Sequence, residues 1–169
     1  CALTGLVARK ASGVLIHKVG SPGSTSAQWA AQAATAGFQA HWAELAPDAI
    51  SILHGTNDQT NGATAGSVAT NYNAIAAGVR SGATWTRQPP VDLLYAAPAE
   101  NLRGIKPAMA DYARAIRKQA LLDGAAFLDL QPAMGPVTAI DWWQLDQIHP
   151  AETYGGPGLT RPFHITFDR

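Results

Sequence analysis

Hydrophobic residues follow two spacings along this chain, and these spacings divide it into predicted strands and helices. Short apolar runs that end at turn-forming residues are typical of buried strands, and they cover Val14–Val19, Ala49–Leu53, Val91–Ala97 and Ala125–Leu130. Segments whose apolar residues return every three or four positions are predicted helices, and they cover Ala2–Ala11, Ser26–Leu45, Thr64–Arg80 and Pro107–Leu122. Such alternation predicts an α/β fold with a parallel sheet and helices on both of its faces.

The two later helices carry the clearest apolar stripes. The stripe of the third predicted helix consists of Val68, Tyr72, Ile75 and Val79. In the last helix the predicted inward residues are Met109, Tyr112 and Ile116, and the outward ones are Arg114, Arg117 and Lys118. The helix over Ser26–Leu45 has a predicted weak point at Gly37, because glycine lowers helix propensity.

Composition excludes several classes of protein. The chain has 169 residues, 47% of them hydrophobic and only 14% charged, with zero net formal charge. This length predicts one domain with a sizeable core, and the neutral charge argues against a nucleic-acid partner. No apolar run reaches the roughly 18 residues that a membrane span needs.

Cysteine and histidine usage argues against a metal or cofactor. Cys1 is the single cysteine, which excludes an internal disulfide framework and a cysteine-based zinc site and leaves the compartment open. His17, His41 and His164 lack metal-ligand spacing. His54, at the end of a predicted strand, is expected to be structural.

Polar residues that could take part in catalysis follow the ends of the predicted strands. Gly20 follows the first strand, Asn57 follows the second, and Asp146 and His149 lie three residues apart beyond the fourth. The carboxyl ends of parallel strands share one edge of the sheet, where α/β proteins bind ligands. Asp146 would orient His149 as a general base, while the Gly20 N–H and the Asn57 amide would bind an oxyanion. A nucleophilic hydroxyl is missing from this set.

The segment Gly55–Asp58 is predicted to be a tight polar turn. Gly55 lets the backbone bend without a Cβ penalty. Asp58 is expected to hold the turn by bonding nearby backbone groups.

Three motifs resemble those of the SGNH (GDSL-type) hydrolases, a family of serine esterases with a flavodoxin-like fold. Gly20–Gly23 matches the glycines of the family's second block, with Lys18 in place of an asparagine. Gly55–Asp58 matches Gly-x-Asn-Asp, and Asp146–Pro150 matches Asp-x-x-His-Pro, in the family's order. The resemblance implies a three-layer α/β/α fold and an acyl-enzyme mechanism that needs no cofactor.

The family's first block, Gly-Asp-Ser, has no counterpart in this sequence. The resemblance places the nucleophilic serine just upstream of Cys1, at the end of a strand between Val14–Val19 and Ala49–Leu53. We therefore expect the chain to be a fragment, with the missing strand supplied by an upstream peptide. Losing that strand would leave ladder groups of both neighbours unpaired.

The carboxyl-terminal end also departs from the family pattern. We expect an SGNH-hydrolase-like domain over residues 1–154 and an irregular tail over residues 155–169. Gly155–Gly158 interrupts a helix that Ala151–Tyr154 begins, and Phe163–Phe167 alternates like a strand. The tail is either an altered ending of the family fold or a link to another domain.

Several site residues have two interpretations. Ser21, Ser24, Ser26 and Cys1 are candidate nucleophiles, although the serines also suit turn and cap roles. Trp142 and Trp143 either line an acyl or sugar pocket or pack in the core.

The leading hypothesis is an acyl esterase and, within that class, a carbohydrate O-acetylesterase. Its expected substrate is a small acyl ester or an acetylated glycan. The alternative is a catalytically silent carbohydrate-binding or structural module on the same fold.

Overall fold

A computed structural model describes residues 13–83, 91–101 and 107–134 of the chain. Its sheet is parallel, with the strand order β1-β2-β3, and consists of β1 (Ala49–Leu53), β2 (Asp92–Ala97) and β3 (Ala126–Asp129). Leu53 pairs with Ala96, and Ala97 pairs with Asp129. The predicted α/β class with a parallel sheet is confirmed.

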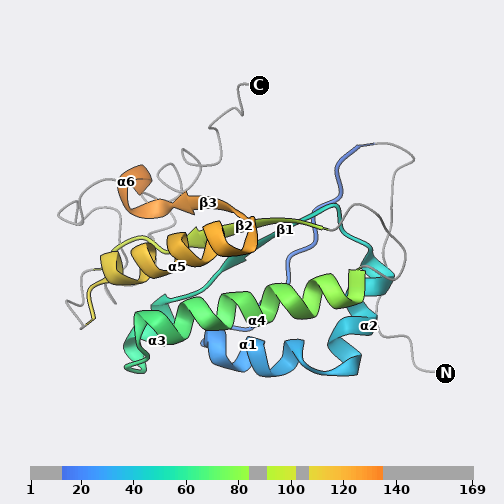
Figure 1. The fold of residues 1–169 in the computed structure, drawn as a ribbon, viewed down its shortest axis with the longest axis horizontal. Helices are drawn as coiled ribbons and strands as arrows, with labels where there is room; N and C mark the ends of the chain where they lie inside the picture. Colours follow the sequence, from blue (N-terminus) through green and yellow to red (C-terminus); the bar gives the residue numbers. More distant parts are fainter. Residues whose placement is uncertain (1–12, 84–90, 102–106, 135–169) are drawn as a thin grey trace.

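The helices are α1 (Ser26–Ala33), α2 (Ala36–Leu45), α3 (Thr56–Thr60), α4 (Ala65–Ala83), α5 (Met109–Asp123) and α6 (Leu130–Met134). Figure 1 shows α4 between α5 on one side and the pair α1 and α2 on the other. The helix predicted over Ala2–Ala11 lies outside the described residues. No helix in the described part of the chain is long and apolar enough to cross a bilayer.

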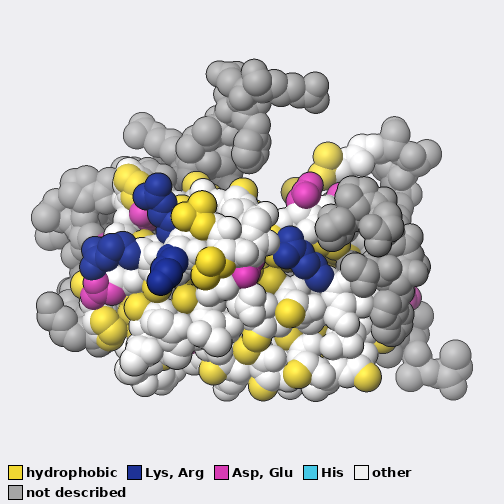
Figure 2. Space-filling model, viewed as in Figure 1, with side chains coloured by type: hydrophobic (Ala, Val, Ile, Leu, Met, Phe, Trp, Pro, Cys, Tyr) yellow, Lys and Arg dark blue, Asp and Glu magenta, His cyan; other side chains and the backbone are white. Residues whose placement is uncertain are grey.

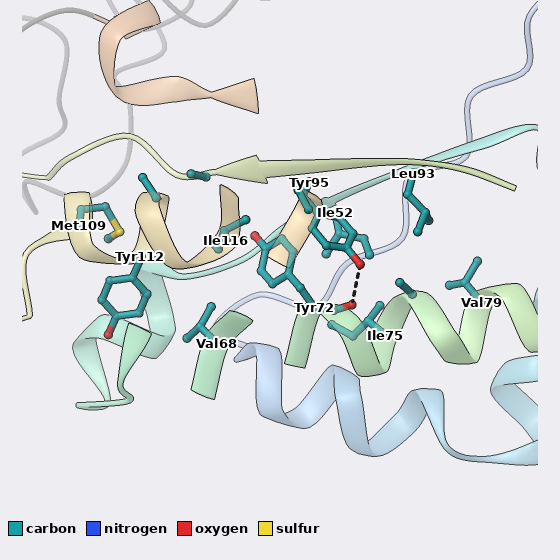
Figure 3. Close-up of a cluster of buried hydrophobic side chains, with 14 of the residues drawn as sticks. Ile52, Val68, Tyr72, Ile75, Val79, Leu93, Tyr95, Met109, Tyr112 and Ile116 are labelled. Carbon is teal, nitrogen blue, oxygen red and sulfur yellow. Dashed lines mark hydrogen bonds between the residues drawn. The ribbon is translucent and has the colours of Figure 1, made fainter. Parts of the chain in front are cut away.

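The core lies between the sheet and the apolar stripes of α4 and α5 (Figure 3). All seven residues predicted to point inward from these helices are buried, with exposures of 5% or less. Tyr95 of β2 reaches into the same cluster; its hydroxyl donates to the Asp123 carboxylate at 2.7 Å and lies 3.5 Å from the Tyr72 carbonyl, the contact that is dashed in Figure 3. The predicted spacing of the two stripes is therefore correct.

The polar face of α5 also agrees with prediction. Arg114, Arg117 and Lys118 are exposed, and Figure 2 shows basic side chains over this helix. The αL conformation of Gly124 ends α5, with φ of 65°, as the glycine signal predicts.

The predicted helix over Ser26–Leu45 is wrong in its continuity, because it is divided at Thr35. Thr25 caps α1 in a capping box with Gln28, and Thr35 caps α2 by accepting from the Phe38 N–H at 3.3 Å. A threonine hydroxyl offers the backbone an alternative to helix continuation. The break therefore falls at Thr35, before the expected weak point at Gly37.

The predicted strand over Val14–Val19 is absent from the described sheet. Its apolar side chains are exposed, at 92% for Val14 and 84% for Ile16. A β-rich composition becomes a strand only where a neighbour completes the ladder, and none of the described strands lies alongside this segment. The turn that follows is confirmed, since the Ser24 N–H donates to the Ser21 carbonyl at 3.1 Å.

Candidate active site

The carboxyl end of β1 leads directly into the candidate site through Gly55. Gly55 has φ of 132°, and a Cβ there would lie 3.0 Å from Pro98 Cγ. Both the backbone angle and the close approach of Pro98 require glycine. The predicted turn is in fact the start of a short helix, because the Gln59 N–H donates to the Gly55 carbonyl at 2.8 Å.

Asn57, in the first turn of α3, joins the two loops that the sequence analysis selected. Its Nδ2 donates to the carbonyl of Ser24 at 2.9 Å. An amide nitrogen carries two N–H donors, so a second donor remains for a ligand. Gly20 and Asn57 line one groove beside β1, and no atom comes within 4 Å of where a Cβ of Gly20 would lie.

Asp58 corrects another expectation, because its bonds reach across to the start of α1. The carboxylate is 1% exposed and accepts from the Ser26 N–H at 3.0 Å and from the Ser26 hydroxyl at 2.6 Å. Asn71 Nδ2 in turn donates to the Ser26 hydroxyl at 2.9 Å. A carboxylate at a helix N-terminus is also favoured by the helix dipole. Asp58 therefore positions α1 against α3.

These bonds decide the roles of two candidate serines. Ser26 is fully buried, so its hydroxyl is inaccessible to a substrate. The Ser24 hydroxyl donates to the Ser21 carbonyl at 2.7 Å and accepts from Trp29 Nε1 at 2.8 Å. Both side chains serve turn and helix-start roles, which was the structural alternative for them.

Tyr72 holds the ends of β1 and β2 together where their ladder stops. Its hydroxyl accepts from the His54 N–H at 2.6 Å and lies 2.8 Å from the Ala96 carbonyl, an acceptor for its proton. The hydroxyl thus stands where a direct His54–Ala96 ladder bond would otherwise form. Burial raises the pKa of Tyr72, so it remains a neutral donor.

His54 has the structural surroundings that were expected. Its ring centroid lies 6.0 Å from Trp29 and 6.5 Å from Tyr72. Burial lowers its pKa, against the attraction of Asp58 for the charged form.

A second buried amide connects α3 to the loops beyond β2. Gln59 is 1% exposed; its Nε2 donates to the Pro107 carbonyl at 2.9 Å, and its Oε1 accepts from Asn101 Nδ2 at 2.8 Å. The sequence pattern predicted Tyr72 only as a core residue; it did not predict the hydrogen bonds of the Tyr72 hydroxyl, those of Gln59, or the Ser26–Asp58 bond. Of these features, only the Ser26–Asp58 bond had a signal in the sequence, namely the position of Asp58 next to Asn57.

The third candidate serine, Ser21, is exposed, and its carbonyl accepts from Ser24 in the turn. The other predicted site residues lie outside the described part of the chain. They are Asp146 and His149, the two tryptophans Trp142 and Trp143, and Cys1. Among the described residues, no three His, Cys, Asp or Glu side chains gather as a metal site would require.

The model of the GDSL-like Lipase/Acylhydrolase family matches residues 2–153. The chain belongs to this family. No match was found among curated proteins.

Solved structures of low sequence identity share the fold of this GDSL-like family member. TesA matches with a TM-score of 0.61 and 21% identity over 82% of this chain and 70% of its own. A carbohydrate esterase family 3 protein from Talaromyces cellulolyticus matches with a TM-score of 0.62 and 16% identity, over 82% of this chain and 64% of its own.

A catalytic mutant of Axe2, an acetylxylan esterase from Geobacillus stearothermophilus, matches with a TM-score of 0.52 and 22% identity over 83% of this chain. The chain spans 66% of the length of that protein and 64% of the Talaromyces one. These similarities establish a common fold, of which the present chain covers a part.

Proposed function

We propose that this chain forms the base and oxyanion-binding part of a serine ester hydrolase. The observation that carries the proposal is the groove beside β1, which both Gly20 and Asn57 line in a member of an acylhydrolase family. The Ser24 carbonyl orients the Asn57 amide at 2.9 Å. A hydrogen-bond donor that is already oriented before the reaction stabilises a developing oxyanion without having to reorganise.

The proposed reaction proceeds through an acyl-enzyme. A serine hydroxyl from outside this chain attacks the ester carbonyl carbon, and its proton passes to His149, which Asp146 orients. The Gly20 N–H, the Asn57 amide and the serine's own N–H bind the resulting oxyanion. The alcohol leaves with the proton from His149, and water then releases the acid and restores the serine.

Short acyl esters are the proposed substrates, with acetyl groups on glycans as the leading candidates. Two of the structural neighbours are named for action on carbohydrate esters. Trp142 and Trp143, which precede the proposed base His149 in the sequence, are proposed to contact the acyl or sugar group.

The test is p-nitrophenyl acetate turnover by the natural full-length protein. His149→Ala is expected to abolish turnover, and Asn57→Ala to lower kcat by roughly 10²–10³-fold, the usual effect of losing one oxyanion donor. Asn61→Ala is the matched control, since the exposed Asn61 bonds only to the Asn57 carbonyl, at 2.9 Å.

Normal turnover in the His149 variant would reject the assignment. Fluorophosphonate labelling separates the rival class: a full-length protein that stays unlabelled but still binds glycans is a silent binding module.

A further inference from the structure

The amino end of α1 is joined to the turn before it by a side-chain hydrogen bond. Trp29 Nε1 donates to the Ser24 hydroxyl oxygen at 2.8 Å. Thr25 is the N-cap of α1, so Ser24 directly precedes the cap and Trp29 is the fourth residue of the helix. In many helices an apolar pair at these two positions packs together and fixes the angle at which the chain enters the helix. In this protein a hydrogen bond joins the same two positions.

The polar groups of Ser24 all take part in this turn. Its N–H donates to the Ser21 carbonyl at 3.1 Å, and its hydroxyl donates to the same carbonyl at 2.7 Å. Its own carbonyl accepts from Asn57 Nδ2 at 2.9 Å. Because the hydroxyl proton is used, only the lone pairs of the oxygen remain, and the indole of Trp29, a donor without an acceptor, matches them. Together these bonds fix the orientation of Ser24.

Both proposed oxyanion donors are connected to this turn. Gly20 precedes Ser21 in the chain, and Asn57 is bonded to Ser24 at the other end of the turn. The two N–H bonds of an amide nitrogen lie in one plane with a fixed angle between them. The bond to the Ser24 carbonyl therefore also sets the direction of the second Asn57 N–H. A shift of the turn would move both donors.

The ring of Trp29 has packing partners that do not depend on its N–H. Its centroid lies 6.5 Å from that of Phe38 and 6.0 Å from that of His54. Trp29→Phe keeps an aromatic ring against these two side chains and removes the donor. The hydrogen bond can therefore be tested apart from most of the packing.

We propose that Trp29 is a positioning residue for the oxyanion site, acting through Ser24 on Asn57 and on the loop that contains Gly20. The effect on turnover rests on the proposed function, whereas the effect on the Asn57 amide rests only on the geometry. Loss of an interaction that is made only in the transition state lowers kcat and kcat/KM equally. Misdirected oxyanion donors should therefore lower kcat and leave KM unchanged.

The first measurement is heteronuclear NMR of the asparagine side chains in the natural full-length protein. Trp29→Phe should move the signal of the Asn57 Nδ2 proton that is bonded to Ser24 upfield, because this bond weakens when the turn is released. Asn73, whose Nδ2 donates to Asp123 at 2.8 Å, is the internal control, and its signals should not move.

Trp42→Phe is the matched control variant. The Trp42 ring also packs against Phe38, with centroids 5.8 Å apart. Its Nε1, however, has no hydrogen-bond partner among the described residues. The same substitution therefore removes an indole N–H that makes no such bond, and the Asn57 signals should stay at their wild-type positions.

The second measurement is p-nitrophenyl acetate turnover. Trp29→Phe should lower kcat by about 2–10-fold, the effect expected from one neutral hydrogen bond, with KM unchanged. Ser24→Ala removes the acceptor of the same bond. Adding Trp29→Phe to Ser24→Ala should therefore lower kcat no further, because the two side chains act as one unit.

The outcomes separate the positioning role from the proposed reaction. Absence of turnover in the wild type counts against the esterase, while a shifted Asn57 signal in Trp29→Phe would still support the positioning role. An unchanged Asn57 signal in that variant overturns the positioning role, whatever the activity, and so does wild-type kcat in Trp29→Phe of an active enzyme. A loss of kcat that adds in full to that of Ser24→Ala overturns it as well, because Trp29 would then act through packing.

Discussion

Asp58 connects the two loops of the candidate site through one buried carboxylate. Its three contacts to the Ser26 amide and hydroxyl, at 2.6–3.0 Å, link residues 32 positions apart. Bonds to a charged acceptor are among the stronger protein hydrogen bonds. Because Asn57 is next to Asp58 in the chain, these bonds also help to fix the position of the Asn57 amide.

Replacing Asp58 by alanine is expected to lower the free energy of unfolding by about 3 kcal/mol, because two buried donors of Ser26 lose their acceptor. Asp58→Asn, which keeps one acceptor oxygen, should lose about half as much. Urea denaturation measures both. Asp92→Ala, at an exposed position, is the control and should change stability by about 0.5 kcal/mol or less; an equal loss in both alanine variants would refute the anchor.

His54 is expected to make folding sensitive to acid. Burial lowers the pKa of His54 in the folded protein below the ordinary histidine value of about 6.5, so between these two pKa values the unfolded chain binds more protons. The free energy of unfolding should therefore fall as the pH drops below about 6.5. Above that pH His54 adds no pH dependence, because it is neutral in both the folded and the unfolded chain. The slope from one group is at most about 1.4 kcal/mol per pH unit.

The measurement compares urea denaturation at pH 7.5 and 5.5 in the wild type and in His54→Gln. The variant should lose less stability on acidification than the wild type. His41→Gln removes an exposed histidine and should keep the wild-type pH dependence. Identical pH slopes in all three proteins would contradict the role of His54.

At the scale of elements, α4 is held close to α1 and α2 by two glycines. A Cβ on Gly78 would lie 2.4 Å from the Ala33 carbonyl oxygen, and one on Gly82 would lie 2.2 Å from the Gln39 carbonyl oxygen. Such distances force backbone to move. The close packing of α1 and α2 against α4 therefore depends on two residues that have no side chain.

Gly78→Ala is expected to destabilise the protein by about 1–3 kcal/mol, even though alanine is the better helix former. Gly66→Ala, in the same helix, meets nothing within 4 Å and should be neutral or stabilising by up to about 1 kcal/mol. Thermal and urea unfolding of the two variants provide the comparison. Stabilisation by Gly78→Ala would show that α4 and α1 are less tightly packed.

The elements also show where sequence patterns succeed. Stripes such as Val68–Val79 were predictable because helix burial depends on a local 3.6-residue period. The Val14–Val19 strand failed because pairing depends on a neighbour that local composition cannot report. The predicted weak point, Gly37, was two residues away from the observed break at Thr35, because a capping threonine competes with glycine as a helix terminator.

At the scale of the molecule, the described sheet and its helices leave one edge of β1 open beside the candidate site. The groove beside β1 is lined by Gly20 and Asn57 together with apolar side chains of α1, α2 and α4.

The sequence by itself determined the alternation of elements, the inward faces of α4 and α5, the family and the two oxyanion candidates. These follow from local periodicity and short motifs, which need no knowledge of distant contacts. Only the tertiary structure decided that Asp58 reaches Ser26 and that Tyr72 spans the end of the β1–β2 ladder. Each of these is a contact between segments far apart in the chain, and side-chain spacing along one segment carries no information about it.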